Sequence, residues 1–256
     1  FFLAVGLFQP HLPFYAPAKY FDQYPREQIT LPPAPADDLE DLPPAATKVA
    51  RAGADKNLKM VVECGELRAA VRGYRASISH ADALIGGLIR TLDSSGYGGN
   101  TIVVFWSDNG YHFGEKQRMA KRSLWDRAAH VPLIIVVPGI TEPGGRCERP
   151  VDLMSIYPTL LELCGLPAKA ENEGASIVPL LRDPTANWEH AALTTHGRGN
   201  NSVRSGHWRY IRYANGDEEL YDLRADRNEW ENLADRPGYE TVKENLAKWL
   251  PKHQAA

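Results

Sequence analysis

A run of β-branched and aromatic residues breaks abruptly into a polar cluster in the middle of the chain. Residues 101–106 read TIVVFW without alternation, which is typical of a strand that is buried on both faces of a sheet. The polar residues begin where this strand should end, at Asp108, Asn109 and Gly110. In open α/β sheets, ligands gather beyond the carboxyl ends of parallel strands, so we expect a functional site here.

A helical pattern precedes this strand, and a second apolar run follows it. Apolar residues recur at steps of three and four over residues 67–92, before Ser94, Ser95 and Gly96, which predicts an amphipathic helix that ends there. Residues 131–137 predict another buried strand. A helix followed by a strand is typical of an α/β crossover, so the pattern predicts a mainly parallel sheet.

A further helical pattern covers residues 151–164. Gly165 stands just past its last apolar residue, where glycine commonly ends a helix. Pro158 interrupts the pattern, and it is either a kink or part of the first turn of a second helical segment.

The pattern changes after residue 167 to short apolar segments that are separated by turn residues. The pairs and triplets between them are Gly-Asn, Ser-Gly and Asn-Gly-Asp, which are typical of antiparallel hairpins. Residues 239–250 predict a closing helix. We therefore expect two parts: an α/β core over residues 1–167 and a small β-rich subdomain over residues 168–256.

The first 46 residues combine an apolar start with many prolines. Residues 1–6 read FFLAVG and predict a short core strand, after which the prolines argue against regular helix through about residue 46. Such a long loop usually serves as a functional rim or lid. His11 stands between Pro10 and Pro13, either as a proton or hydrogen-bond donor of a site or as a loop histidine bonded to backbone. Because the chain starts without Met or a charged leader, we expect it to begin inside a domain.

Composition narrows the classes of function. The chain has 256 residues, of which 43% are hydrophobic, so it can bury a sizeable core. A formal net charge of −3 gives no basic surface for nucleic acid. No apolar run reaches the roughly 20 residues that a membrane span needs. Cys64, Cys147 and Cys164 are widely spaced, which leaves reduced thiols or a single disulfide as alternatives.

Asp108 and Asn109 are the first candidate ligands. A carboxylate and an amide oxygen suit a hard cation such as Ca²⁺ or Mg²⁺, and Gly110 would permit the turn that makes them converge. The alternative is a type I turn in which both side chains cap their own backbone.

Three other positions complete the set of candidates. Lys121 lies thirteen residues beyond Asp108 and would stabilise negative charge, unless it is an ordinary solvent lysine. His112 either touches a substrate or forms hydrogen bonds within its loop. Asn200, Asn201 and Arg204 are candidates to approach the site from the small subdomain.

These residues lie in segments that resemble the sulfatases of the alkaline-phosphatase-like superfamily, particularly iduronate-2-sulfatase-like and bacterial members. The resemblance covers most of the chain in order. The matching segments besides the polar cluster are FFLAVGLFQPHLPF at 1–14, AHVPLIIVVPG at 129–139, VDLMSIYPTLLELCGLP at 151–167 and NSVRSGHWRYIRYANGDEELYDLRADRNEWENLA at 201–234. The resemblance implies an α/β/α sandwich with a mainly parallel sheet and a smaller C-terminal antiparallel subdomain with a closing helix.

The resemblance also implies an activity, namely hydrolysis of a sulfuric ester on a sulfated sugar. In that family an Asp-Asn or Asp-His pair binds calcium, which assigns Asp108 and Asn109 to Ca²⁺, with Mg²⁺ as the alternative. It assigns Lys121, rather than Lys116, and His11 to the sulfate pocket. It suggests a periplasmic, extracellular or lysosomal-type compartment.

One departure from the family pattern limits this interpretation. Sulfatases carry an early Cys-x-Pro-x-Arg or Ser-x-Pro-x-Arg motif that supplies the formylglycine nucleophile, and an early Asp-Asp pair. The nearest stretch here, residues 64–68, reads CGELR and lacks the proline. We therefore expect this chain to carry the second half of the site and to be inactive without the missing N-terminal half as its partner. The alternatives are a phosphodiesterase or phosphonate monoester hydrolase, or a non-catalytic remnant that binds a sulfated glycan.

Overall fold

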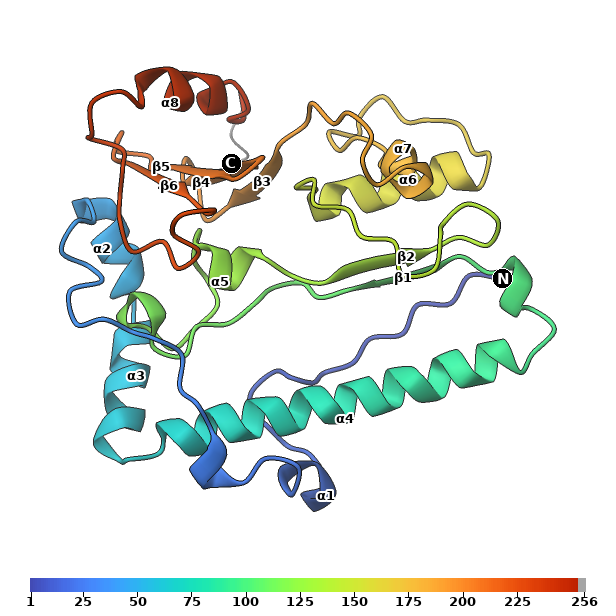
Figure 1. Ribbon diagram of the computed structural model, residues 1–256, viewed down its shortest axis with the longest axis horizontal. Coiled ribbons are helices and arrows are strands. Elements are labelled where there is room, and N and C mark those ends of the chain that lie inside the picture. Colours follow the sequence, from blue (N-terminus) through green and yellow to red (C-terminus); the bar gives the residue numbers. More distant parts are fainter. Residues whose placement is uncertain (253–256) are drawn as a thin grey trace.

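A long helix and a strand pair form the first part of the structure, a computed structural model that describes residues 1–252 apart from the side chains of residues 54 and 55. Helix α4 (Leu67–Asp93) runs along one side of the molecule, and the strand pair lies above it (Figure 1). The strands of the pair are β1 (Val103–Trp106) and β2 (Leu133–Val136). The other helices are α1 (Ala18–Phe21), α2 (Pro44–Ala50), α3 (Ala54–Glu63), α5 (Asp126–Ala129), α6 (Ile156–Leu163), α7 (Val178–Arg182) and α8 (Glu240–Ala247).

Helix α4 confirms the periodicity of residues 67–92 almost to the residue. Its buried side contains Gly73, Ser77 and Ala81, at steps of four, which place residues on one face. Arg72 fastens the proline-rich segment to the helix, because its Nε donates to the carbonyl of Tyr24 at 2.7 Å. Toward the C-terminal half of the helix, several apolar side chains are exposed instead. The apolar stripe is therefore only partly covered.

Strands β1 and β2 pair antiparallel, with Val103 opposite Val136 and Trp106 opposite Leu133. Both strands form where they were predicted, and the α/β class is confirmed. The prediction that they are buried on both faces is wrong: Trp106, Ile134 and Val136 are 47%, 55% and 48% exposed, since the described residues add no further strand to this pair. The mainly parallel sheet, however, is not formed by the residues that the structure describes. A parallel pair needs a crossover connection, whereas the connection between β1 and β2 holds only the short turn Glu115–Gln117 and the four-residue α5, so the chain reverses direction.

The N-terminal segment corrects two further predictions. Residues 1–6 are extended but unpaired, and Phe1 and Phe2 are 82% and 87% exposed, so the core strand expected there is absent. The reason is that a strand needs a neighbour with which to exchange backbone hydrogen bonds. Prolines also begin helices rather than exclude them: α1 follows Pro17, and Pro44 occupies the first turn of α2, where its missing N–H costs no helical bond.

Helix α6 settles the two alternatives for Pro158. A short 3₁₀ turn (Leu153–Ser155) precedes α6, and Pro158 is the third residue of the α-helix. It therefore lies in the first turn of a second segment, where its missing N–H has no helical partner to lose. Gly165 has a φ of 65° just past the helix, as predicted for the end of the helix.

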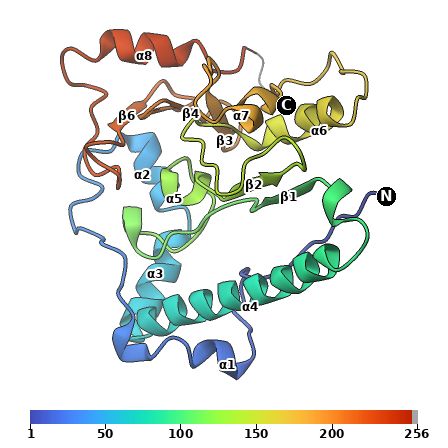
Figure 2. The same cartoon turned by 45° about the vertical axis from the view of Figure 1, so that its right-hand side comes forward.

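The C-terminal part is the antiparallel sheet that the turn residues predicted. Its strands follow one another in the order β3 (Ala192–Thr195), β4 (Asn201–Ser205), β5 (Trp208–Arg212) and β6 (Glu218–Asp222). Helix α8 covers one face of this sheet (Figure 2). The small antiparallel sheet and its closing helix are thus both confirmed.

The two faces of this sheet alternate along each strand. Tyr210 and Leu220 pack toward α8 through Leu246. Ile211 and Tyr221 belong instead to a core with Trp125, at the start of α5. The sheet is therefore packed between the closing helix and the loop that follows the predicted site.

Buried charges join this loop to segments far away in the sequence. Lys116, 1% exposed, forms an ion pair with Asp38 at 2.7 Å, and its Nζ also donates to the carbonyl of Glu229. Arg209 of β5 binds Glu229 at 2.6 Å and Asp126 at 2.5 Å. These contacts join residues that precede residue 167 to residues that follow it. The division of the chain into two domains at residue 167 stays a prediction.

One buried carboxylate organises the aromatic core under the sheet. Glu219 accepts hydrogen bonds from the Nε1 of Trp125 at 2.8 Å and from the hydroxyls of Tyr213 and Tyr221. Burial raises the pKa of both tyrosines, and the adjacent carboxylate adds to this effect. Both hydroxyls therefore stay protonated as donors.

Two simpler observations complete the description. Cys64, Cys147 and Cys164 are exposed free thiols, in line with the reduced alternative. Within residues 1–252, no helix has both the length and the apolar character that crossing a membrane requires.

We predict that Lys116→Met destabilises the fold by about 3–5 kcal/mol, because it leaves the buried Asp38 carboxylate without a partner. The double variant with Asp38→Asn should recover much of the loss. Lys59→Met is the matched control, since Lys59 pairs with Glu63 on the surface and its replacement should change stability by less than about 0.5 kcal/mol. Urea unfolding measures the free energy of unfolding of all three variants. Equal losses in Lys116→Met and Lys59→Met would contradict the assignment of Lys116 to a stabilising buried ion pair.

Candidate functional site

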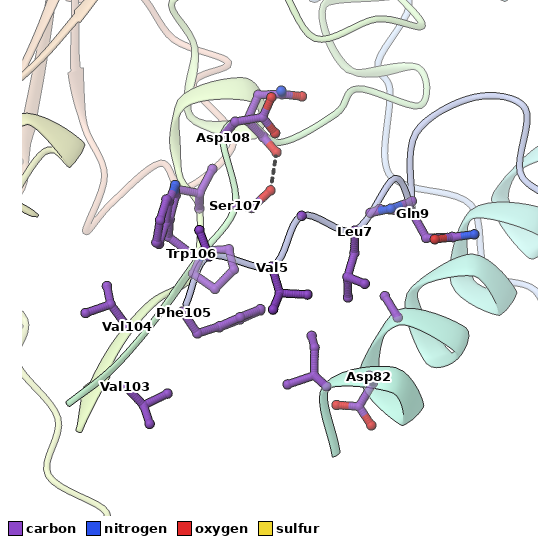
Figure 3. A pocket seen from close by; sticks show the side chains of 18 of the residues that line it. Val5, Leu7, Gln9, Asp82, Val103, Val104, Phe105, Trp106, Ser107 and Asp108 are labelled. Carbon is purple, nitrogen blue, oxygen red and sulfur yellow. Dashed lines mark hydrogen bonds between the residues drawn. The ribbon is translucent and has the colours of Figure 1, made fainter. Parts of the chain in front are cut away.

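A large hollow lies between α4, the N-terminal segment and the strand pair. Its volume is about 2470 Å³, and it extends from residues 1–12 past β1 to the loop that follows it. Val5, Leu7 and Phe105 form part of its apolar wall, and Asp108 stands at the end of β1 (Figure 3). The predicted residues that line it are His11, Asp108, Asn109 and Lys121. Four residues from three separate parts of the sequence thus line one space.

The turn after β1 presents Asp108 and Asn109 to this hollow. The hydroxyl of Ser107 donates to the carbonyl of Asn109 at 3.0 Å, which closes the turn. Gly110 donates its N–H to the carbonyl of Ala128 at 2.8 Å. A side chain at Gly110 would place its Cβ 2.1 Å from the carbonyl oxygen of Arg127. Glycine is therefore required by close backbone approach.

Asp108 is exposed and Asn109 is half-buried. Their oxygens are of the type that Ca²⁺ and Mg²⁺ bind, but Ca²⁺ takes about six to eight oxygen ligands. No group of three or more His, Cys, Asp or Glu side chains suited to a metal occurs among the described residues. Two donors fit one side of a hard-cation site, and the assignment of the metal stays a prediction.

The two lysines of the following loop have different surroundings. Lys116 is buried in its ion pair with Asp38, so its ammonium group does not reach the hollow. Lys121 is half-buried and lines the hollow. Arg118 lies between the two lysines and fastens the loop, because its guanidinium donates to the carbonyls of Val49 and Arg122, both at 2.8 Å. The sulfate-binding role of Lys121 stays a prediction.

His112 lies inside the loop and is fully buried. Its Nδ1 is 3.2 Å from the carbonyl oxygen of Glu115, and its Nε2 is 2.9 Å from the hydroxyl of Ser123. Since a carbonyl only accepts, Nδ1 carries the proton and Nε2 accepts from Ser123. Burial and the positive charge of Arg118 lower the pKa of His112 to about 3. These bonds favour the alternative in which His112 supports its own loop.

His11 is exposed at the opposite wall, in the proline-rich segment. Its Nδ1 donates to the carbonyl of Leu12 at 2.7 Å, since the carbonyl oxygen can only accept. Nε2 is therefore left for another partner. Both alternatives for His11 remain compatible with this geometry, because one nitrogen binds backbone and the other is available.

The sequence patterns missed the residue that the small subdomain contributes. His196, after β3, lines the hollow. Asn200 and Asn201 instead hold the hairpin: Asn200 donates its amide to the carbonyl of His196, and Asn201 accepts from Thr195, both at 2.9 Å. The two glycines Gly197 and Gly199, so close together, were the sequence signal that the chain reverses next to His196. Both have positive φ in the structure.

Known proteins resemble the chain in both sequence and fold. A family model described as Sulfatase matches residues 1–166, and one described as N-sulphoglucosamine sulphohydrolase, C-terminal, matches residues 114–256. A protein called Sulfatase from Formosa agariphila is 40% identical over 255 residues, which cover 100% of this chain and 50% of that protein. The chain spans about half the length of the curated relatives it matches.

Two solved structures share the fold. One, solved in complex with its substrate D-glucosamine-2-N,6-O-disulfate, has a TM-score of 0.75 and 20% identity, and the match covers 94% of this chain and 62% of that one. The phosphonate monoester hydrolase from Silicibacter pomeroyi has a TM-score of 0.78 and 22% identity, with 93% and 53% covered.

We predict that His112 makes stability depend on pH. Its folded pKa of about 3 lies below its ordinary value of 6.5, so protonation favours the unfolded chain. Its contribution is complete above pH 6.5 and is lost as the pH falls toward 3, by about 1.4 kcal/mol per pH unit.

Urea unfolding at several pH values measures this slope. His112→Gln should flatten it between pH 6 and 4, whereas the exposed His190→Gln should not. An unchanged slope in His112→Gln would refute the assignment.

Proposed function

Because the chain belongs to the sulfatase family, we propose that it carries the second half of the active site of a sulfuric ester hydrolase that acts on a sulfated sugar. The observation that supports this most directly is the convergence of His11, Asp108, Asn109 and Lys121 on one hollow. A sulfated sugar is also the substrate named for one of the proteins with this fold.

Lys121 and His11 would act on the ester itself. The ammonium group of Lys121 would neutralise a sulfate oxygen and stabilise negative charge as it develops, since a preorganised cation is most effective in a partly dry site. The Nδ1 of His11 is occupied by the carbonyl of Leu12. Because Nδ1 donates to that carbonyl, Nε2 would carry a proton for the leaving oxygen only in the imidazolium form, with both ring nitrogens protonated.

Asp108 and Asn109 would hold Ca²⁺, or Mg²⁺ as the alternative. When bound, such a cation supplies positive charge against the sulfate oxygens. The turn closed by Ser107 and Gly110 keeps the two donors on the hollow side of β1. The other metal ligands and the formylglycine nucleophile would come from the N-terminal half.

The exposed apolar residues on the wall of the hollow are evidence for an N-terminal half that covers it. Four large apolar side chains of the wall are exposed: Phe1, Phe2, Phe8 and Trp106. Exposed apolar surface of this size is typical of an interaction site. The curated relatives are about twice as long as this chain. We therefore assign the cover of the hollow to the N-terminal half, which would close the site at the same time.

The second candidate is a phosphonate monoester hydrolase. The structural match to one such enzyme is as good as the match to the protein solved in complex with its substrate D-glucosamine-2-N,6-O-disulfate. Lysine and a hard cation stabilise phosphonate and sulfate oxygens alike. Turnover of an aryl sulfate and of an aryl phosphonate by the same completed protein separates the two activities.

We predict that the purified chain hydrolyses no aryl sulfate, and that the chain extended by its upstream coding sequence does. The reason is that the nucleophile motif and most metal ligands lie outside these 256 residues. An in-frame Cys-x-Pro-x-Arg upstream is expected, whereas a genuine start codon at this boundary would favour a non-catalytic remnant. Clear turnover by the purified chain would refute the division of the site.

In the extended protein, we predict that Lys121→Ala lowers kcat by about 10²–10³-fold, because a preorganised charge against the sulfate is lost. Lys59→Ala, at an exposed lysine of α3, should leave kcat unchanged. Steady-state kinetics with an aryl sulfate give both values. A Lys121→Ala enzyme with the kcat of the parent would remove this residue from the site.

A further inference from the structure

A second cation stands next to Lys121 on the wall of the hollow. Arg122 is exposed and lines the same space. Within the part of the chain that the structure describes, its guanidinium takes part in no ion pair. The other basic groups nearby are engaged, since Arg127 binds Glu115 at 3.1 Å and His130 binds Asp126 at 3.2 Å. Lys121 and Arg122 are therefore the cations left for a ligand.

The backbone at Arg122 is held in place by the side chain of Arg118. The buried guanidinium of Arg118 donates to the carbonyl of Arg122 at 2.8 Å and lies 5.9 Å from the ring centre of Trp125. It also donates to the carbonyl of Val49. The main chain that carries Arg122 is thus held in one place, while the side chain extends into solvent. This is the arrangement of a preorganised binding group.

His196 approaches the same part of the wall from the small subdomain. Its backbone N–H donates to the carbonyl of Asn200, and the side chain of Asn200 both returns a bond to His196 and accepts from the N–H of Ala214 at 3.0 Å. Burial lowers the pKa of His196, and the positive charges of Arg118 and Arg122 lower it further. The imidazole lines the same hollow as Arg122 and is available there as a neutral hydrogen-bond donor.

A sulfate monoester carries one negative charge, and Lys121 already provides one cation for it. A guanidinium and a donor beside it match the planar, two-oxygen geometry of a further oxyanion. We propose that Arg122 and His196 form a subsite for a second anionic group, a carboxylate or another sulfate, on the same sugar. This rests on the proposed function, because Lys121 is taken to bind the sulfate ester that is cleaved.

The test measures binding to this chain and needs no turnover. Isothermal titration at low salt compares three probes: galactose 6-sulfate with one anionic group, a 2-sulfated uronic acid with a sulfate and a carboxylate, and a glucosamine disulfate. We expect at least one of the dianions to bind about fivefold tighter than the monoanion, the size of a solvent-screened ion pair. Which dianion is preferred identifies the second group as carboxylate or sulfate.

Two variants test whether Arg122 and His196 cause the preference for dianions, and a third variant is the control. Arg122→Gln should remove the fivefold difference, and His196→Ala should reduce it. Arg198→Gln removes the same charge from the His196 hairpin at an exposed position outside the hollow, and it should keep the difference. Circular dichroism confirms that each variant folds.

Three results would overturn the subsite: equal affinity for monoanion and dianions, no measurable binding of the dianions, or an equal loss in Arg198→Gln. Failure of the extended protein to hydrolyse sulfate esters would refute the proposed function instead. The two proposals therefore fail in different experiments.

Discussion

The ion pair between Lys116 and Asp38 is the contact on which the shape of the candidate site depends. Both side chains are almost fully buried, so each charge is tolerated only because the other is 2.7 Å away. Lys116 itself has a φ of 53°, a conformation that costs energy for a residue with a side chain. The loop pays this cost because the pair, together with the carbonyl of Glu229, joins the proline-rich segment, the site loop and the small subdomain.

The elements that could be predicted are those whose stability is local. Helix α4 and strands β1 and β2 follow from periodicity and apolar runs, because a residue's neighbours in sequence are also its neighbours in the element. Residues 1–6 have an equally apolar pattern, yet they form no strand. A strand exists only with a partner, and the sequence pattern of one segment carries no information about which partner is present.

The candidate site shows the same difference between residues that local sequence identifies and residues that depend on tertiary contacts. Asp108 could be proposed because a strand end marks it, and Lys121 because of the resemblance to the sulfatases; both line the hollow. The burial of His112 depends on Ser123 and on packing against Trp125, which no spacing reveals. His196 is brought to the hollow by the docking of the sheet on Trp125, which donates to Glu219 of β6. Tertiary contacts, rather than motifs, decide these two positions.

The hairpin of residues 196–200 is held by its own asparagine, Asn200, and by Ala214 of the same sheet. The loop that carries Lys121 is held separately by Arg118 and the Lys116 pair. A change in the length or charge of the hairpin would therefore leave the loop that carries Lys121 in place. The proposed subsite for a second anion could then vary while the groups proposed to bind the ester keep their positions.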